Sequence, residues 1–289
     1  MSCFICLEAG GLEDACPCAA TVHTACLAKF LERGFAPRCP VCNAAFTSLS
    51  RYDAAAHLFR LAPTPLRRLC LAAAATAHGM PAEAMELLKS VIARPFYRIP
   101  YNIELGNALL ALGEVQKALC VLSDVLDALF ETQDDILMMC PSVCAHALTL
   151  SAKGHCSQGE LRLAEGAVRV VLEMAPQLSI DECLDAMQVM VKICAKRNDG
   201  VGVMAARQTI LNILTSEERR DPWEIAGARA ELALAQIARG NGAAAAHLGP
   251  ALRILRKRPS QDGLVERARG ALVGRPTKRL RGKTPPEDA

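Results

Sequence analysis

Apolar side chains recur at three- and four-residue spacings through the middle of the chain, and small residues interrupt them at regular offsets. Five glycines each separate two such apolar runs: Gly79, Gly113, Gly159, Gly200 and Gly240. An alanine follows each glycine by five residues: Ala84, Ala118, Ala164, Ala205 and Ala245. The apolar spacing predicts amphipathic helices. The glycines predict helix ends with positive φ, and the small residues predict close helix crossings.

This self-similarity predicts a stack of helix hairpins, because a single hairpin cannot bury its apolar face alone. The clearest units span residues 105–126 and 158–176. They resemble tetratricopeptide (TPR) repeats, and the resemblance covers residues 62–258, or about five helix pairs. A generic alanine-rich bundle is the alternative. Pro81, Pro141 and Pro222 are predicted as first helical residues, with Asp221 as an N-cap.

The composition supports helices and gives no sign of a membrane segment. The chain of 289 residues is 52% hydrophobic but only 4% aromatic. Its longest uncharged apolar stretch, near Leu69–Ala77, is far shorter than the ~20 residues that span a bilayer. No secretory leader precedes Cys3, so we expect a reducing compartment, cytoplasmic and/or nuclear.

Eight metal-ligating side chains stand in four close pairs within the first 42 residues. They are Cys3, Cys6, Cys16, Cys18, His23, Cys26, Cys39 and Cys42. Thiolates and imidazole are the ligands that zinc prefers, and a closed structural site needs four of them. The pattern therefore predicts two Zn²⁺ ions. A zinc knot that only replaces a missing core is the alternative to an active finger.

The ligand order resembles the RING-CH variant of the RING finger, on the residues Cys3–Cys6, Cys16–Cys18, Val22–Leu27 and Cys39–Cys42. The resemblance covers residues 1–48 and implies a cross-braced fold with two sites. The first site would use Cys3, Cys6, His23 and Cys26, and the second would use Cys16, Cys18, Cys39 and Cys42. The short gap between Cys18 and His23 also suits a PHD finger. Pro37 stands where a PHD finger usually carries an aromatic residue, and Pro40 favours RING.

The RING resemblance implies that the protein is a soluble ubiquitin ligase. The expected fold is a small cross-braced two-zinc finger joined to an all-α TPR-like solenoid. Such a ligase has no catalytic side chain of its own, because it works by positioning a ubiquitin-loaded conjugating enzyme. By resemblance, the conjugating enzyme docks on Ile5, Phe30 and Pro40. Asn43 stands where many RING ligases carry a cation. The alternative is therefore a non-catalytic adaptor, with a PHD-like or scaffold finger.

The helical array is predicted to recruit a protein substrate or partner. By the repeat alignment, Asn107, His146, Lys153 and Arg197 face its concave groove, and Lys153 and Arg197 would attract an acidic or amidic segment. Solvated first-helix positions are the alternative.

The remaining segments are a connecting helix or linker at 49–61 and a tail at 259–289. Residues 253–289 contain eleven Lys and Arg against four Asp and Glu. We expect the tail to be disordered and to act as a nuclear-import signal or a solvated end. It has no aromatic residue for base stacking, which argues against nucleic acid. Seven cysteines outside the finger are expected to be small core residues. They are Cys70, Cys120, Cys140, Cys144, Cys156, Cys183 and Cys194. Cys140, Cys144 and His146 suggest a further metal site, but no second close pair completes it.

Overall fold

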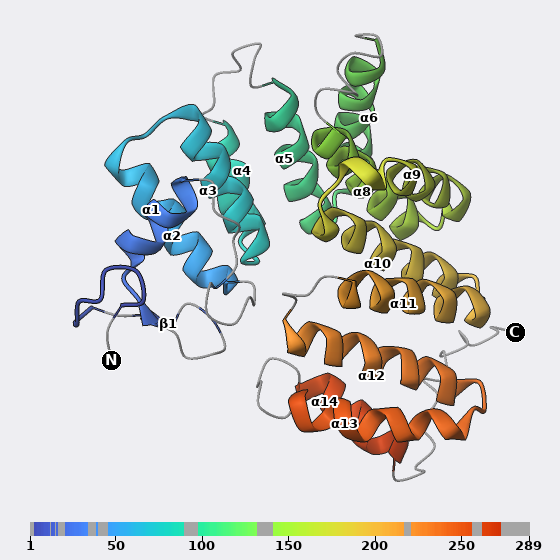
Figure 1. Cartoon of the computed structure of the whole chain (residues 1–289). Coiled ribbons are helices and arrows are strands. Elements are labelled where there is room, and N and C mark those ends of the chain that lie inside the picture. Colours follow the sequence, from blue (N-terminus) through green and yellow to red (C-terminus); the bar gives the residue numbers. More distant parts are fainter. Residues whose placement is uncertain are drawn as a thin grey trace, which may run out of the picture. The chain divides into compact units, whose positions relative to one another are not determined.

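The protein is predominantly helical, as its apolar periodicity predicts (Figure 1). The computed structural model describes residues 3–11, 13–14, 16, 21–33, 39, 46–89, 98–131, 141–216, 221–255 and 262–272. Two short strands near the N-terminus accompany the helices. Within these described ranges, none of the helices combines the length and the apolar character that a bilayer crossing requires.

The N-terminal segment that was predicted to be a finger, and is called the finger below, contains a small hairpin and one helix. Strand β1 (Glu13–Asp14) pairs antiparallel with β2 (Thr21–Val22), and α1 (Thr24–Glu32) follows. The finger's core contains Val22, Leu27 and Ala28 together with Phe46, which precedes α2 (Ser48–Leu61), and Ala54 within it. The predicted connecting helix at 49–61 is therefore part of the finger's hydrophobic core, which a segment this small needs.

Helix hairpins follow one another along the rest of the chain (Figure 1). The pairs are α3 (Pro65–Ala77) with α4 (Pro81–Lys89), α5 (Arg98–Ala111) with α6 (Val115–Glu131), α8 (Pro141–Gln158) with α9 (Leu161–Glu173), α10 (Ile180–Lys196) with α11 (Gly200–Thr215), and α12 (Pro222–Ala238) with α13 (Ala245–Leu255). A short 3-10 turn, η2 (Ala175–Gln177), follows α9, and another, η3 (Gly242–Ala244), precedes α13. Pro81, Pro141 and Pro222 are first helical residues, as predicted.

The turns inside the hairpins share one hydrogen-bond pattern. In the first, Gly79 has φ 85° and the Met80 N–H donates to the Ala75 carbonyl at 2.8 Å. This bond satisfies a carbonyl that the helix end leaves free. The prediction of positive φ at Gly200, in the turn of the fourth hairpin, was wrong. There Asn198 has φ 56°, and Gly200 is the first residue of α11 instead.

The predicted burial of the alanine five residues after each glycine is confirmed for three hairpins and wrong for two. Ala84, Ala118 and Ala164 are fully buried. Ala205 is exposed because the turn before it is shifted to Asn198, and Ala245 is half-buried beside the buried Ala244. The second hairpin is tightly packed at Gly106, where an added Cβ would lie 2.8 Å from Cγ of Leu122.

The chain divides into two compact units, residues 1–221 and 222–289, so the predicted array of 62–258 spans both. In the second unit, α12, α13 and α14 (Asp262–Leu272) enclose a core that includes Leu248, Leu252 and Val265. Helix α14 corrects the prediction of disorder for this part of the tail, because its apolar face packs on that core. Residues 273–289 lie outside the described ranges.

The described cysteines beyond the finger divide by burial, and Cys140, with the further metal site considered for it, lies outside the described residues. Cys144, Cys156, Cys183 and Cys194 are buried, as predicted for small core residues. Cys70 and Cys120 are exposed, so that prediction was wrong for them.

Candidate metal centre

Four of the predicted ligands come together at the N-terminus. The candidate ligand atoms of Cys3, Cys6, His23 and Cys26 all lie within 4.8 Å of one another. The first and third ligand pairs thus meet, and Cys16, a described residue between them in sequence, is not one of the four. This is the set that the RING-CH resemblance implies for the first site.

The loop carrying Cys3 and Cys6 is shaped by backbone hydrogen bonds. The Leu7 N–H donates to the Cys3 carbonyl at 2.8 Å, and the Cys3 N–H donates to the Glu8 carbonyl at 2.8 Å. The Phe4 N–H donates to the Thr21 carbonyl at 3.2 Å, which attaches the loop to β2. The Ile5 N–H also donates to Sγ of Cys3 at 3.4 Å. An N–H directed at sulfur stabilises the thiolate form that a metal requires.

His23 lies between β2 and α1, and both of its ring nitrogens have defined partners. Nδ1 is 3.3 Å from Sγ of Cys6 and 3.7 Å from Sγ of Cys26. Nε2 is 2.6 Å from the Gly10 carbonyl oxygen, which can only accept. Nε2 therefore carries the proton, and the Nδ1 lone pair faces the cysteines. A carbonyl partner of this kind is typical of metal-binding histidines. Gly10 has φ 96°, a conformation that glycine adopts without strain.

The geometry fits zinc. Tetrahedral bonds of about 2.3 Å to sulfur and 2.0–2.1 Å to nitrogen place these two atoms about 3.6 Å apart. The two observed nitrogen–sulfur distances, 3.3 and 3.7 Å, bracket that value. Three thiolates and one imidazole form a closed ligand set, typical of a structural ion.

The close packing of this cluster shifts the pKa values of its Cys3 and Cys26 thiols in opposite directions. Burial alone would raise the pKa of Cys3, but hydrogen bonds from the backbone of Cys6, His23 and Ile5 outweigh it and lower that pKa to about 6. Burial, together with hydrogen bonds and charge repulsion from Cys6 and Cys3, raises the pKa of Cys26 to about 11. A bound dication removes this repulsion, so metal and full deprotonation are linked.

The second predicted ligand set is described only in part. Cys16 and Cys39 are buried in the finger's core, whereas Cys18 and Cys42 lie outside the described residues.

The proposed docking residues have different surroundings. Ile5 is exposed on the loop between Cys3 and Cys6. Phe30, on α1, is half-buried and packs edge-to-face on Phe46, with ring centroids 6.2 Å apart. Pro40 lies outside the described residues.

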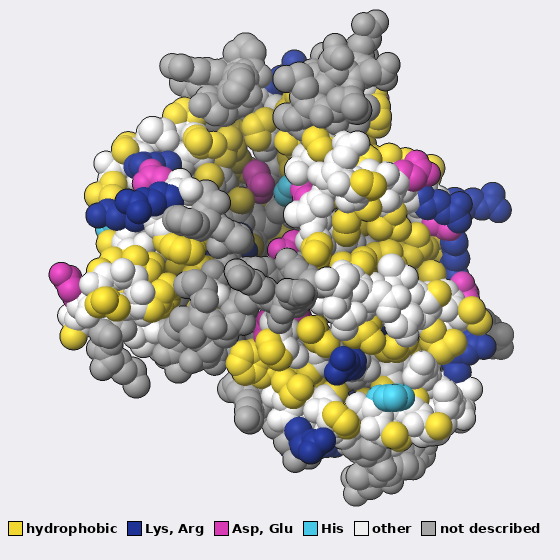
Figure 2. All heavy atoms as spheres, viewed as in Figure 1, with side chains coloured by type: hydrophobic (Ala, Val, Ile, Leu, Met, Phe, Trp, Pro, Cys, Tyr) yellow, Lys and Arg dark blue, Asp and Glu magenta, His cyan; other side chains and the backbone are white. Residues whose placement is uncertain are grey.

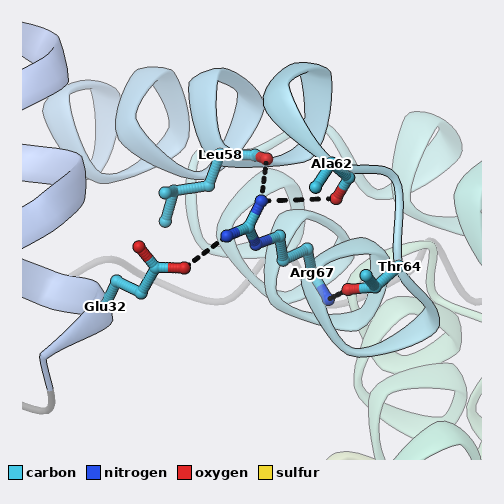
Figure 3. Close-up of polar contacts among 5 residues, drawn as sticks. All are labelled: Glu32, Leu58, Ala62, Thr64 and Arg67. Carbon is cyan, nitrogen blue, oxygen red and sulfur yellow. Dashed lines mark hydrogen bonds and ion pairs between the residues drawn. The ribbon is translucent and has the colours of Figure 1, made fainter.

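Arg67 connects the finger to the first hairpin (Figure 3). Its guanidinium forms an ion pair with Glu32, the last residue of α1. The same guanidinium donates to the Leu58 carbonyl at 2.9 Å and to the Ala62 carbonyl at 3.5 Å, at the C-terminal end of α2. One side chain on α3 thus holds two elements of the finger.

The residues predicted to line the groove do not gather in one place. His146 lines a pocket between α5, α8 and α10, and the Asn107 side chain bonds to Glu104 of the same pocket. Lys153 lies farther along α8, and its charge lowers the pKa of His146. Arg197 ends α10 and is bound elsewhere. Its guanidinium pairs with Glu165 at 2.5 Å and donates to the Leu161 carbonyl at 3.1 Å, so it joins α10 to α9.

The acidic side chains of this pocket were missed by sequence reasoning. They are Glu104, Glu182 and Asp185. The spacing of Glu182 and Asp185 places both on one face of α10, which is a weak signal that many solvated helices share.

The comparisons with known proteins leave the function open. No protein-family model matches the chain, and no curated protein matches it. Among solved structures, the chain is similar to a crystal structure of BtubC (BKLC) from P. vanneervenii. The two are 15% identical, with a TM-score of 0.42 over 84% of this chain and 96% of that one. A TM-score of this size is too low to establish a shared fold.

Proposed function

We propose that the protein is a zinc-dependent ubiquitin ligase of the RING type, in which the finger positions a ubiquitin-loaded conjugating enzyme and the helical hairpins recruit the protein to be modified. The observation that carries the proposal is the meeting of Cys3 and Cys6 with His23 and Cys26. Such pairing of the first ligand pair with the third is the cross-brace of RING fingers. The second zinc would be held by Cys16, Cys18, Cys39 and Cys42.

Zinc supplies structure in this proposal and takes no part in the chemistry. Its four ligands close the site, so no position is open for water or substrate. The chain's own contribution is to hold Ile5 exposed on the first zinc-binding loop, where it can contact the conjugating enzyme. Catalysis then comes from holding the thioester of the loaded enzyme near a lysine of the recruited protein.

Autoubiquitination by the purified chain, with a panel of conjugating enzymes, tests this function. Ile5→Ala should abolish transfer while the zinc content stays at wild type, because an exposed apolar side chain at a small interface contributes much of its binding energy. Leu66→Ala is the matched control, since Leu66 is an exposed apolar residue on α3 outside the proposed docking set. Phe30→Ala should also reduce transfer, but it removes the contact with Phe46 as well. Wild-type transfer by Ile5→Ala would exclude this docking surface.

A non-catalytic adaptor is the second candidate, and three observations favour it. The gap between Cys18 and His23 is short, Asn43 replaces a cation, and Phe30 has a packing partner within the finger. An adaptor with this finger would bind two zinc ions and capture its partners without transferring ubiquitin. Failure of transfer with every conjugating enzyme, together with intact zinc content, would select this function.

A further inference from the structure

A pocket of about 340 Å³ opens between the first helices of three successive hairpins, α5, α8 and α10. This volume is at the lower end of the range for ligand pockets. Figure 2 shows a hollow in the surface beside these helices, where acidic and histidine side chains gather.

The charge of this pocket is negative. Glu104 comes from α5, and Glu182 and Asp185 come from α10. Facing them from α8 is His146, whose pKa is lowered by burial and by nearby Lys153, so the imidazole is neutral near pH 7. The charge is therefore opposite to that predicted from Lys153 and Arg197.

One carboxylate oxygen in the pocket has no partner. Oε2 of Glu104 is buried and makes no hydrogen bond, although Asn107 bonds to the same carboxyl group. A buried acceptor without a donor costs free energy, and an incoming N–H group would satisfy it.

The rest of the wall is largely apolar. Pro100, Ile103, Val143 and Ala145 line it beside the acidic groups. A ligand that suits both parts has an aliphatic stem and a cationic end. Lysine and arginine side chains have this form, since their stems cover apolar surface while the charged head meets a polar partner.

We infer that this pocket binds a lysine or arginine side chain presented by an extended segment of a partner protein. A pocket built from first helices of successive hairpins suits a segment that crosses several of them. The inference deepens the recruiting role proposed for the hairpins, but it does not depend on ubiquitin transfer.

Fluorescence anisotropy with the full chain tests the inference directly. The probe is a fluorescein-labelled glycine–serine peptide with an arginine–lysine pair at its centre. Two comparison peptides carry a glutamine pair or a glutamate pair there. The arginine–lysine peptide should bind saturably and lose affinity as salt rises, and the glutamine peptide should bind about tenfold more weakly.

The variant for this assay is the double substitution Glu182→Gln and Asp185→Asn. Glutamine preserves the capping box that Glu182 forms with Ser179, so α10 should stay intact. Affinity for the arginine–lysine peptide should fall by about tenfold, equivalent to ~1.4 kcal/mol. Glu173→Gln, an exposed substitution on α9 outside the pocket, should change nothing. If the double variant fails to fold, Asp185→Asn alone should weaken binding by about threefold.

Two results would overturn the inference: equal binding of the glutamine peptide, or wild-type affinity in the pocket variants. Autoubiquitination of the double variant should equal that of the wild type. For the wild-type chain, absence of peptide binding with intact transfer would refute the pocket, whereas absence of transfer with intact peptide binding would refute the ligase.

Discussion

Arg67 and Glu32 form an ion pair between the first hairpin and the last residue of the finger's helix α1. The pair alone is worth little, because both side chains are partly exposed. The contribution of Arg67 comes mainly from its bonds to the Leu58 and Ala62 carbonyls at the end of α2, each of which also accepts one backbone N–H.

Arg67→Ala should therefore loosen the last turn of α2 by about 1–2 kcal/mol, since charged donors to backbone carbonyls are among the stronger hydrogen bonds. Glu32→Gln should cost under about 1 kcal/mol, because the carbonyl bonds survive. Hydrogen exchange of the amides at the end of α2 measures both. Equal exchange in the two variants would show that the ion pair, and not the capping, holds this junction.

Metal removal should unfold the finger and spare the hairpins. Elemental analysis should give two zinc ions per chain, and Cys3→Ser should lose one of them, because each closed site needs its fourth ligand. A chelator should abolish the finger's proteolytic protection while most of the helical circular dichroism remains, since the hairpins have cores of their own. One zinc or none in the wild type would refute the two-site assignment.

Gly10→Ala should weaken zinc binding at the first site by about 10- to 100-fold, the usual effect of losing a partner of a metal-binding histidine. Gly10 has φ 96°, so alanine would move the carbonyl that bonds to His23. Competition with a chromophoric chelator measures the affinity. Gly166→Ala is the control, because Gly166 is helical and an added Cβ would have no neighbouring atom within 4 Å. The zinc affinity of this variant should equal that of the wild type.

Gly106→Ala should destabilise the second hairpin by about 1–3 kcal/mol, as overpacking of a core usually does. The new Cβ would lie 2.8 Å from Cγ of Leu122, which is fully buried. Urea unfolding followed by circular dichroism tests this. Gly166→Ala again serves for comparison and should be neutral or stabilising by up to about 1 kcal/mol. A neutral Gly106→Ala would mean that α5 and α6 can separate at no cost.

Glu104→Gln should stabilise the protein at neutral pH and have little effect near pH 4. Burial raises the pKa of Glu104, and the Asn107 bond only partly offsets this. Between the ordinary carboxyl pKa and the raised one, the native state binds more protons than the unfolded chain, so stability falls as pH rises through that window. The melting temperature at pH 7.5 should rise by about 2–4 °C, equivalent to about 1 kcal/mol.

Glu173→Gln should leave the melting temperature unchanged at both pH values. An equal rise at pH 4 and pH 7.5 would contradict the role of ionisation at Glu104. The Glu104→Gln variant should also bind the arginine–lysine peptide more weakly than the wild type. Higher stability combined with weaker binding is expected when a residue serves ligand binding at a cost to stability.

The sequence by itself determined the features that depend on local chemistry. Pro81 and Pro141 begin helices because a first helical residue needs no N–H partner, and Gly79 ends one because it tolerates positive φ. The eight candidate ligands could be singled out because zinc selects cysteine and histidine in close pairs, and four of them do lie together. Asn198 escaped prediction because asparagine adopts the same φ less often than glycine and stands close to Gly200.

Only the tertiary structure decided which distant groups meet. It brought Cys3 to His23, and it placed Glu104 beside His146 and Asp185 in one pocket. It also directed Arg197 to Glu165, away from the groove. Each of these contacts depends on how separate elements pack and on the rotation of each helix about its axis. A sequence pattern specifies which face of a helix is apolar, but the charge of a pocket depends on the polar residues that several packed helices bring to its edge.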